Sequence, residues 1–262
     1  MAFAALDLFS TCSIYLDWKF ASFWRYCPAV AITKNSQNDD AVVRSAPLFS
    51  ALSDEQAESL RSSMTPVKVN KGQTLFKEGD PGDRLFVVLE GKLKLGTASG
   101  DGRENLLSIL GPGEMFGELS VFDPGPRTST ATAVTDTRLL ALAHDQVIGW
   151  VTAHPQVSLQ LLGRLAQRLR RTNEALADLV FSDVPGRVAK ALIDLGTRFG
   201  VTKEDGLHVN HELTQEELAQ LVGASRETVN KALADFAGRG WVRLEPRAVV
   251  VLDYERLSKR SR

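Results

Sequence analysis

A carboxylate and a guanidinium flank a rigid turn in residues 115–133, MFGELSVFDPGPRTSTATA. Glu118 follows a glycine, and Arg127 comes nine residues later, directly before three small hydroxyl residues. The turn between them, DPGP at residues 123–126, is restricted by its two prolines. An acid and a base placed in this way either pair with each other or hold one small molecule between them. They suit binding better than catalysis, because no nucleophile–base pair accompanies them.

A second group of polar residues lies near the C-terminus, in residues 213–245. Thr214 predicts the start of a short helix, and Glu217, three residues on, completes a capping box. Gly223 can take the positive φ of a tight turn, and Ser225 caps the next helix. Two short helices joined by a glycine turn form a helix-turn-helix. The segment WVRLEPRAVVVLD then predicts two strands, which makes this a winged helix.

The second of these helices carries four polar residues toward its N-terminal end, Arg226, Glu227, Asn230 and Lys231. A recognition helix meets the base edges of DNA with this end. Arginine can bond O6 and N7 of guanine together, and glutamate can accept from N4 of cytosine. The alternative is an ordinary pair of helices with a solvated charged face. The wing, and a dimer-forming helix upstream, favour DNA.

Length and composition fit a two-domain protein of 262 residues with a net charge of −1. This charge gives the whole chain no electrostatic preference for nucleic acid. The two cysteines, Cys12 and Cys27, cannot complete a four-thiolate iron–sulfur site or a tetrahedral zinc site. No other metal-ligand spacing is present. We expect free thiols in a cytoplasmic protein, with a disulfide as the alternative.

The N-terminal stretch, residues 9–32, is the most apolar and aromatic part of the chain. Three charged residues and a proline interrupt it, which makes it a poor membrane-spanning helix. It also lacks the basic start and the cleavage site of a signal peptide. We expect residues 1–40 to be an extra, flexible segment, ending in a polar linker at residues 33–40 and making no membrane contact. An interfacial anchor or an extra interaction surface is the alternative.

Residues 67–143 alternate short runs of Val, Leu and Phe with turn signals about every ten residues. Such spacing is typical of an all-β sandwich, barrel or jelly roll rather than of βαβ units. Residues 83–96 form a hairpin candidate with EGK as its turn. Upstream, residues 53–64 predict a short helix with Ser53 as its N-cap. Downstream, residues 137–150 predict a last strand that passes into a helix.

A long helix is predicted from about Pro155 to Phe181. Its apolar residues recur at intervals of 3 and 4, with Thr172 in the one vacant slot: Leu162, Leu165, Leu169, Leu176 and Leu179. Such a stripe is typical of a coiled-coil seam, whereas a helix that packs on its own core shows a wider stripe. We therefore predict a dimer seam, with packing on the β domain as the alternative. Thr172 and Asn173 interrupt the seam, so this pair sets the register or contacts a ligand.

Residues 182–200 predict another helix, with Asp183 as its N-cap and VPG as a hinge. The domain boundary falls here. The predicted organisation is an extra segment at 1–40, a β domain at 41–154, a dimerisation helix with its hinge at 155–184 and a DNA-binding domain at 185–262.

Three of these segments resemble motifs of one family. FGELSVFDPGPRTSTA resembles the phosphate-binding cassette of cyclic-nucleotide-binding domains, and LTQEELAQLVGASRETVNKAL resembles the helix-turn-helix of the cAMP receptor (CRP/FNR) family. RRTNEALADLVFSDVPGRVAKAL resembles the same family's dimerisation helix and hinge. The three motifs follow the family's order from about Ala41 to the C-terminus. The resemblance implies an α+β fold with a β jelly roll, a long dimerisation helix and a C-terminal winged helix-turn-helix.

The resemblance also implies a cAMP site. Glu118 matches the acid that accepts the ribose 2′-hydroxyl, and Arg127 matches the arginine that neutralises the cyclic phosphate. Thr172 and Asn173 match the pair that reaches the purine from one's own chain and across the seam; serine is frequent in the family at the second position. The implied ligand residues are Gly117, Glu118, Leu119, Arg127, Thr128, Thr172 and Asn173.

The implied DNA contacts are Thr214, Ser225, Arg226, Glu227, Thr228, Asn230 and Lys231. Arg226 and Glu227 match the base-reading pair, and Thr214 matches a phosphate-contacting helix cap. Lys231 stands where arginine is usual, and it lacks the bidentate fork, which predicts softer readout at that base pair. The loop at residues 201–207 lies where relatives touch RNA polymerase.

The sequence thus predicts a homodimeric, cAMP-responsive transcription regulator and no enzyme. Its partners would be double-stranded DNA, cAMP, a second copy of the chain and RNA polymerase. One alternative is the same fold binding DNA constitutively, with a vestigial or different ligand site. Another is a nucleotide-binding module that regulates a partner protein.

Overall fold

The computed structural model describes residues 36–100 and 104–261. The predictions for residues 1–35, which include both cysteines and the apolar stretch at 9–32, lie outside the described residues. None of the described helices is long and apolar enough to cross a membrane.

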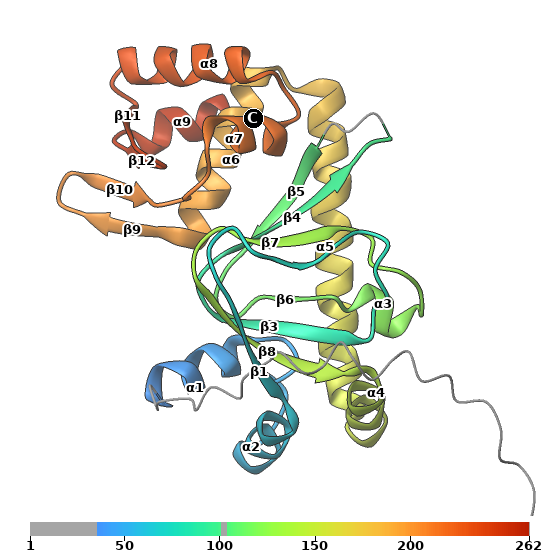
Figure 1. The fold of residues 1–262 in the computed structure, drawn as a ribbon. Helices are drawn as coiled ribbons and strands as arrows, with labels where there is room; N and C mark the ends of the chain where they lie inside the picture. Colours follow the sequence, from blue (N-terminus) through green and yellow to red (C-terminus); the bar gives the residue numbers. More distant parts are fainter. Residues whose placement is uncertain (1–35, 101–103, 262) are drawn as a thin grey trace, which may run out of the picture. The chain divides into compact units, whose positions relative to one another are not determined.

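The described chain folds into a β-rich part, a long helix and a C-terminal domain (Figure 1). Its helices are α1 (Ser36–Ser45), α2 (Asp54–Ser63), α3 (Leu119–Phe122), α4 (His144–Ala153), α5 (Pro155–Phe181), α6 (Val184–Phe199), α7 (Gln215–Val222), α8 (Arg226–Gly238) and α9 (Tyr254–Arg260). Its strands are β1 (Thr65–Val69), β2 (Thr74–Phe76), β3 (Arg84–Glu90), β4 (Leu93–Ala98), β5 (Glu104–Leu110), β6 (Met115–Phe116), β7 (Thr130–Ala133), β8 (Thr137–Ala143), β9 (Gly200–Lys203), β10 (Gly206–Val209), β11 (Val242–Glu245) and β12 (Ala248–Val251).

The β-rich part consists of two antiparallel sheets, β1-β8-β3-β6 and β2-β7-β4-β5. The core between them includes Phe86, Leu93, Leu110, Phe116 and Leu139. A second apolar cluster packs α1, α2, α4 and the start of α5 against the other face of β3 and β8. The jelly-roll fold predicted for this region is confirmed.

The hairpin predicted at residues 83–96 is wrong. Strand β3 pairs with β8 and β6, whereas β4 pairs with β5 and β7, so the EGK turn carries the chain from one sheet to the other. Gly91 has a φ of 88°, and an added Cβ would meet the carbonyl oxygen of Asp136 at 2.3 Å. A short glycine turn serves a hairpin and a sheet-to-sheet corner equally well, so the local sequence does not distinguish them.

The polar linker predicted at residues 33–40 is also wrong from Ser36 onward, because α1 begins there. Asp39 is buried in this helix and accepts two hydrogen bonds from Arg138 of β8, at 3.0 and 2.6 Å. Such a bidentate pair combines charge with fixed geometry. The ion pair thus fixes α1 to the first sheet. The next helix, α2, begins at the predicted Ser53 capping box.

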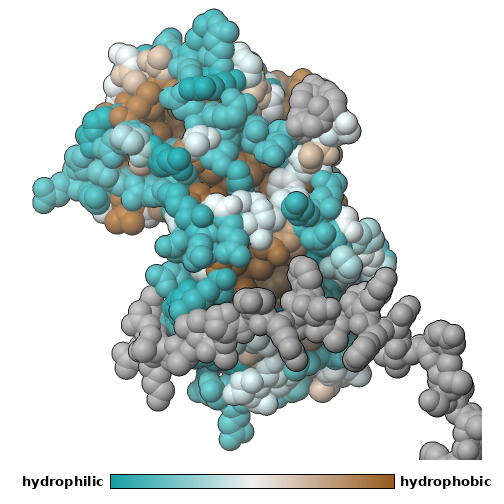
Figure 2. Space-filling model, in the orientation of Figure 1, coloured by the Kyte–Doolittle hydropathy of each residue, from teal (hydrophilic) through white to brown (hydrophobic). Residues whose placement is uncertain are grey.

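The long helix α5 spans Pro155–Phe181, as predicted. Only Val157 and Leu161, near its start, are buried. Four residues of the predicted seam are exposed by 52–61%: Leu162, Leu169, Leu176 and Leu179. Hydrophilic and apolar side chains are mixed on the face drawn in Figure 2. The four leucines differ from such scattered apolar residues because they recur on one helix at intervals of 3 to 7 residues. The alternative, in which the stripe packs on its own β domain, fails for these four residues.

The C-terminal domain contains α6–α9 and a four-stranded sheet in the order β11-β12-β10-β9. Its core gathers α6, α7 and α8 around residues such as Leu192, Leu218 and Phe236. The predicted caps are present: Asp183 accepts from Gly186 N at 2.9 Å, and Thr214 forms a capping box with Glu217. The wing predicted from the sequence is the antiparallel pair β11–β12.

A buried histidine lies just before α7. His211 is 5% exposed, and its Nδ1 accepts a hydrogen bond from the Leu213 amide at 3.0 Å. Burial, aided by the nearby charge of Lys92, lowers the pKa of His211 to about 4. The folded chain therefore holds His211 neutral at pH values where the unfolded chain binds a proton.

This histidine predicts a loss of stability in mild acid. Between pH 6.5 and 4 the unfolded chain gains the proton first, so His211 lowers the free energy of unfolding by at most about 1.4 kcal/mol per pH unit. We expect His211→Asn, whose amide oxygen can still accept from Leu213, to lose less stability on acidification. Urea unfolding at pH 7, 5.5 and 4.5 measures this, with His144→Asn as the control. Equal losses in wild type and His211→Asn would contradict it.

Candidate nucleotide site and DNA-reading helix

The first half of the site is the junction between β6 and α3. Gly117 has a φ of 81°, and an added Cβ would lie 2.7 Å from Arg127 Nη1 and 2.8 Å from the Arg84 carbonyl oxygen. Only glycine takes this backbone conformation without strain and leaves the arginine in place. The chain can therefore turn here and deliver Glu118 at the start of α3.

The second half of the site is Arg127, which follows the DPGP turn and is only 4% exposed. Its backbone is fixed on the loop before β3: Arg127 N donates to Asp80 O at 2.8 Å and Gly79 N donates to Arg127 O at 2.9 Å. Its Nη1 donates to Gly117 O at 3.2 Å, and its Cζ lies 4.4 Å from the ring centroid of Phe76. Burial lowers the pKa of Arg127, while Asp83 at 4.0 Å opposes the shift.

Glu118 and Arg127 lie in one pocket without forming an ion pair. Glu118 is 3% exposed, and its Oε1 instead accepts a hydrogen bond from Arg168 Nη1 of α5. Glu118 Oε2 and Arg127 Nε are buried, and neither has a hydrogen-bond partner among the described residues. Buried polar atoms without partners are costly and rare. A ligand that offers a hydroxyl to one and an anionic oxygen to the other satisfies both.

The pocket gathers five of the seven ligand residues predicted from the sequence. Its lining consists of Phe76, Leu95, Phe116, Gly117, Glu118, Leu119, Ser120, Arg127, Thr128, Ser129 and Arg168. Thr172 and Asn173 are exposed on α5 and lie outside this lining. The Thr172 hydroxyl donates to the Arg168 carbonyl oxygen at 3.0 Å, so this residue stands one helical turn beyond the pocket.

Sequence reasoning missed Arg168 and Phe76. Arg168 lies four residues before Thr172, and residues i and i+4 share one face of a helix. This spacing is the signal that could have identified Arg168, because a residue of α5 on the same face as Thr172 lies one helical turn away. Phe76 comes from a strand far away in the sequence, and no local pattern connects it with Arg127.

The predicted recognition helix is α8, which follows α7 through Gly223 at a φ of 64°. The N-cap Ser225 accepts from Thr228 N at 3.2 Å. Three predicted base-reading residues, Arg226, Glu227 and Lys231, have exposed side chains. Lys231 Nζ lies 2.7 Å from Glu227 Oε1, an exposed pair that DNA can break at small cost.

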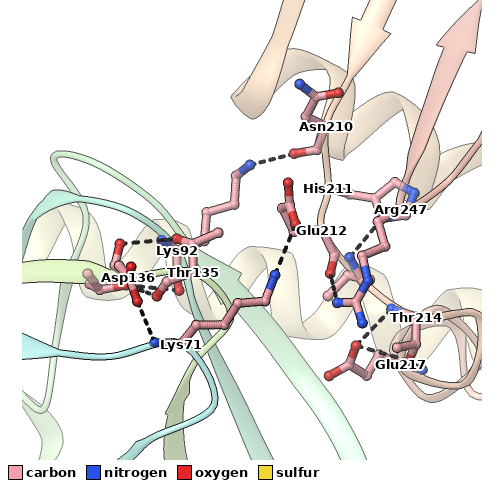
Figure 3. Close-up of polar contacts among 12 residues, drawn as sticks. Lys71, Lys92, Thr135, Asp136, Asn210, His211, Glu212, Thr214, Glu217 and Arg247 are labelled. Atoms are coloured by element: carbon pink, nitrogen blue, oxygen red, sulfur yellow. Dashed lines mark hydrogen bonds and ion pairs between the residues drawn. The ribbon is translucent and has the colours of Figure 1, made fainter.

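Asn230 differs from the expectation that it lies on the open polar side of the helix. The residue is half-buried, and its Oδ1 is buried without a hydrogen-bond partner in the described part of the chain. A DNA base could therefore bond Asn230 Oδ1 only by approaching the surface of α8 closely. Thr214 caps α7: its hydroxyl accepts from Glu217 N at 3.1 Å and donates to Glu217 Oε2 at 3.0 Å (Figure 3).

The hinge between α5 and α6 is connected to the turn of the helix-turn-helix by one guanidinium. Arg187 Nη1 donates to the Ser182 carbonyl oxygen at 2.7 Å. Its Nε donates to Val222 O at 2.9 Å and its Nη2 to Gly223 O at 3.2 Å. Hydrogen bonds from a charged donor are stronger than neutral ones. These bonds join the α5–α6 junction to the turn between α7 and α8.

Comparison with known proteins matches both halves of the chain. Residues 66–154 match the family described as cyclic nucleotide-binding domain, and residues 186–260 match the Crp-like helix-turn-helix domain. A CRP-like cAMP-activated global transcriptional regulator of Mycobacterium tuberculosis is 54% identical over 85% of this chain and 100% of its own length. This chain belongs to the CRP/FNR family of transcription regulators. Like the other members of the CRP/FNR family, it is a regulator and not an enzyme.

Two further relatives extend the CRP/FNR comparison. The cyclic AMP receptor protein of Thermus thermophilus is 37% identical over 80% of this chain and 94% of its own length. A solved CRP/FNR-family transcriptional regulator from the same organism superimposes with a TM-score of 0.64 at 28% identity, covering 75% of this chain and 98% of that one. The protein is therefore a cyclic-nucleotide-responsive, DNA-binding transcription regulator of the CRP/FNR fold.

Gly117→Ala tests the packing of the pocket. A methyl group at this positive φ strains the backbone and displaces Arg127, which together destabilise the fold by about 1–3 kcal/mol. We expect a lower free energy of unfolding and weaker nucleotide binding, measured by urea unfolding and calorimetry. Gly125→Ala is the matched control, because its nearest neighbour would be the Asp123 carbonyl oxygen at 3.7 Å. If Gly117→Ala and Gly125→Ala change the free energy of unfolding and the nucleotide affinity equally, the close approach of Gly117 to Arg127 does not matter for binding.

Proposed function

We propose that the protein is a cytoplasmic homodimer whose binding to palindromic operators is gated by cAMP. One observation carries this proposal: Glu118 and Arg127 are both buried in one pocket, unpaired with each other, and each keeps one polar atom without a partner. cAMP offers a ribose hydroxyl and a cyclic phosphate close together. The relative in Mycobacterium tuberculosis is named as cAMP-activated, which supports this choice of nucleotide.

The proposed ligand contacts follow from the atoms that are available. Arg127 Nε would bind the cyclic phosphate, and Glu118 Oε2 would accept the ribose 2′-hydroxyl. Gly117, Leu119 and Thr128 would complete the phosphate side with backbone amides and a hydroxyl. The purine would extend toward α5, where Thr172 and, from across the seam, Asn173 would reach it.

Arg168 gives this ligand a means of acting on α5. Its guanidinium holds Glu118 Oε1, so the sugar and the long helix share one carboxylate. A ligand shifts a conformational equilibrium only through different affinities for the two states. Occupancy at Glu118 changes how strongly Arg168 is held, and this difference would move α5 relative to the β domain.

The proposed dimer joins two copies through the exposed leucines of α5. Apolar side chains at intervals of 3 and 4 pack against the same stripe of a second helix. Two recognition helices related by this axis would read half-sites about 34 Å apart. Arg226, Glu227 and Lys231 would contact bases, with Thr214, Ser225 and Thr228 on the phosphates and Asn230 at the closest approach. The β9–β10 turn region would face RNA polymerase.

Nucleotide titration tests the ligand part of the proposal. We expect calorimetry to show binding of cAMP, and Arg127→Gln to weaken it by roughly 10- to 100-fold, because a hydrogen bond to a charged group is lost. Arg170→Gln, an exposed change on α5, is the matched control. A parallel cGMP titration measures preference between the two nucleotides. No heat with cAMP, together with unchanged operator binding, would instead favour a constitutive DNA-binding regulator.

A charge on the seam tests the dimer. Leu169→Glu places two carboxylates against apolar neighbours across the proposed axis, and we expect the dimer dissociation constant to rise at least about 100-fold. Analytical ultracentrifugation reads this directly. Gln167→Glu adds the same charge on a position outside the stripe and should leave the dimer intact. A dimer unaffected by Leu169→Glu would show that the chain associates through another surface.

A further inference from the structure

A carboxylate outside the lining of the nucleotide pocket lies beside the guanidinium of Arg127. Asp83 Oδ1 is 4.0 Å from Arg127 Nη2, which is too long for a hydrogen bond but close enough for an ion pair. The side chain of Asp83 is 71% exposed, whereas that of Arg127 is 4% exposed. Asp83 therefore lies at the solvent edge of the buried guanidinium, and we call it the rim acid.

Two turns rich in proline and glycine pack on each other and fix the position of the rim acid. Pro81 forms an antiparallel bridge with the DPGP turn. An added Cβ on Gly82 would lie 2.1 Å from Ser120 Cβ of α3, so only glycine lets the chain pass this close to α3. The next residue is Asp83, whose carbonyl oxygen accepts from His144 N at 2.9 Å. Backbone contacts thus hold the rim acid beside the pocket.

The side chains of Asp80 and Asp83 have different tasks. Asp80 Oδ2 accepts from Lys77 N at 2.7 Å and so holds its own loop. In the described part of the chain, the rim acid contacts its neighbours through charge: Oδ1 faces Arg127, and Oδ2 lies 3.5 Å from Nε of the adjacent Arg84. A change at Asp80 would therefore disturb the loop, whereas a change at Asp83 would remove a charge and leave the loop in place.

The carboxylates around Arg127 limit the negative charge that the pocket can accept. Burial lowers the pKa of Arg127, and Asp83, Asp80 and Glu118, in that order of size, oppose the shift. The second guanidinium of the pocket, Arg168, pairs with Glu118. Two guanidinium groups thus face three carboxylates before any ligand binds. The pocket offers an anion a directed hydrogen bond at Arg127 Nε, but no excess of positive charge.

Nucleotide phosphates differ in charge, and the rim acid is placed to respond to this difference. A cyclic phosphodiester carries one negative charge at neutral pH. A phosphate monoester such as that of 5′-AMP has a second pKa of about 6, so it carries close to two charges at neutral pH. An anion bonded to Arg127 Nε lies within a Debye length of the rim acid, about 8 Å in physiological salt. The monoester therefore meets nearly twice the repulsion that the diester meets.

We propose that Asp83 is a specificity-determining residue of the nucleotide site: its carboxylate, fixed beside Arg127, favours the singly charged cyclic phosphate over the doubly charged phosphate of nucleoside monophosphates. The proposal rests on the proposed function, in which cAMP binds in this pocket. It adds the class of ligand that the pocket rejects and the residue that rejects it.

A merely structural role for Asp83 predicts a different result. If the rim acid only orients the guanidinium of Arg127, its loss weakens the binding of every anionic ligand by the same factor. If it selects by charge, its loss favours the doubly charged ligand more than the singly charged one. The ratio of the two dissociation constants therefore separates these roles.

Three variants of the full chain test the rim acid. Asp83→Asn removes the charge and keeps the shape of the side chain, whereas Asp83→Glu keeps the charge. Asp123→Asn, an exposed change on the DPGP turn, is the matched control. Calorimetry measures the dissociation constant of cAMP, and competition against cAMP measures that of 5′-AMP. Both are measured at a pH of about 7.5 and of about 5, where 5′-AMP loses its second charge, and again in high salt, which screens exposed charges.

At the higher pH, the preference for cAMP over 5′-AMP should fall about three- to ten-fold in Asp83→Asn, the effect of one charge at this distance near a protein surface. Asp83→Glu and Asp123→Asn should keep the preference of the wild type. At the lower pH, and in high salt, the wild type and Asp83→Asn should differ less.

An unchanged preference in Asp83→Asn overturns the proposal, and so does a fall in preference that is equal at both pH values. If cAMP binds and the preference does not change, only the role of the rim acid is wrong, and the proposed function stands. If the wild type binds no cAMP, the proposed function fails and the selectivity of Asp83 fails with it.

Discussion

The protein depends on keeping two buried opposite charges apart. Coulomb attraction in a low-dielectric pocket would draw Glu118 and Arg127 together, yet each is held by other groups. Arg127 is fixed by the backbone of Gly117, the ring of Phe76 and the ladder around the DPGP turn. Glu118 is held on one oxygen by Arg168. The energy that an internal ion pair would release thus remains available to the proposed ligand, and Arg168 would connect that ligand to α5.

Much of the fold and of the nucleotide site could be predicted from the sequence, because the patterns that indicate them lie within short segments of the chain. Capping boxes at Ser53 and Thr214, the glycine turn at Gly223 and the leucine spacing of α5 each follow from residues within one or two turns. Five of the predicted ligand residues lie within twelve positions of one another and meet in one pocket. The sequence alone therefore predicts that Glu118 and Arg127 lie close together around the rigid DPGP turn.

What the sequence did not reveal depends on contacts between distant segments. The EGK turn was expected to close a hairpin, but whether a glycine turn joins paired strands or two sheets depends on β8, which lies about 50 residues away. The linker predicted at residues 33–40 gives way to α1 from Ser36 onward, where Asp39 pairs with Arg138 of β8, a residue about 100 positions away in the sequence. The contact between β5 and α6–α7 left no periodic pattern, since a bulge hides the face that Leu106 takes. Register shifts and long-range ion pairs are tertiary facts that propensity does not encode.

A bulge at Leu107 decides which residues of β5 meet the DNA-binding domain. Leu95 pairs with Ser108 and the next residue, Gly96, pairs with Leu106, so Leu106 shares a face with Ile109 and packs with Leu192 and Leu218. Alternate residues of a strand face opposite ways, so in a regular ladder in which Leu107 paired with Gly96, Leu106 would pair with Thr97 and point into the sandwich. A change that moved the bulge along β5, so that Leu107 paired with Gly96, would then turn Leu106 away from Leu192 and Leu218 without altering any residue of the nucleotide pocket or of α8.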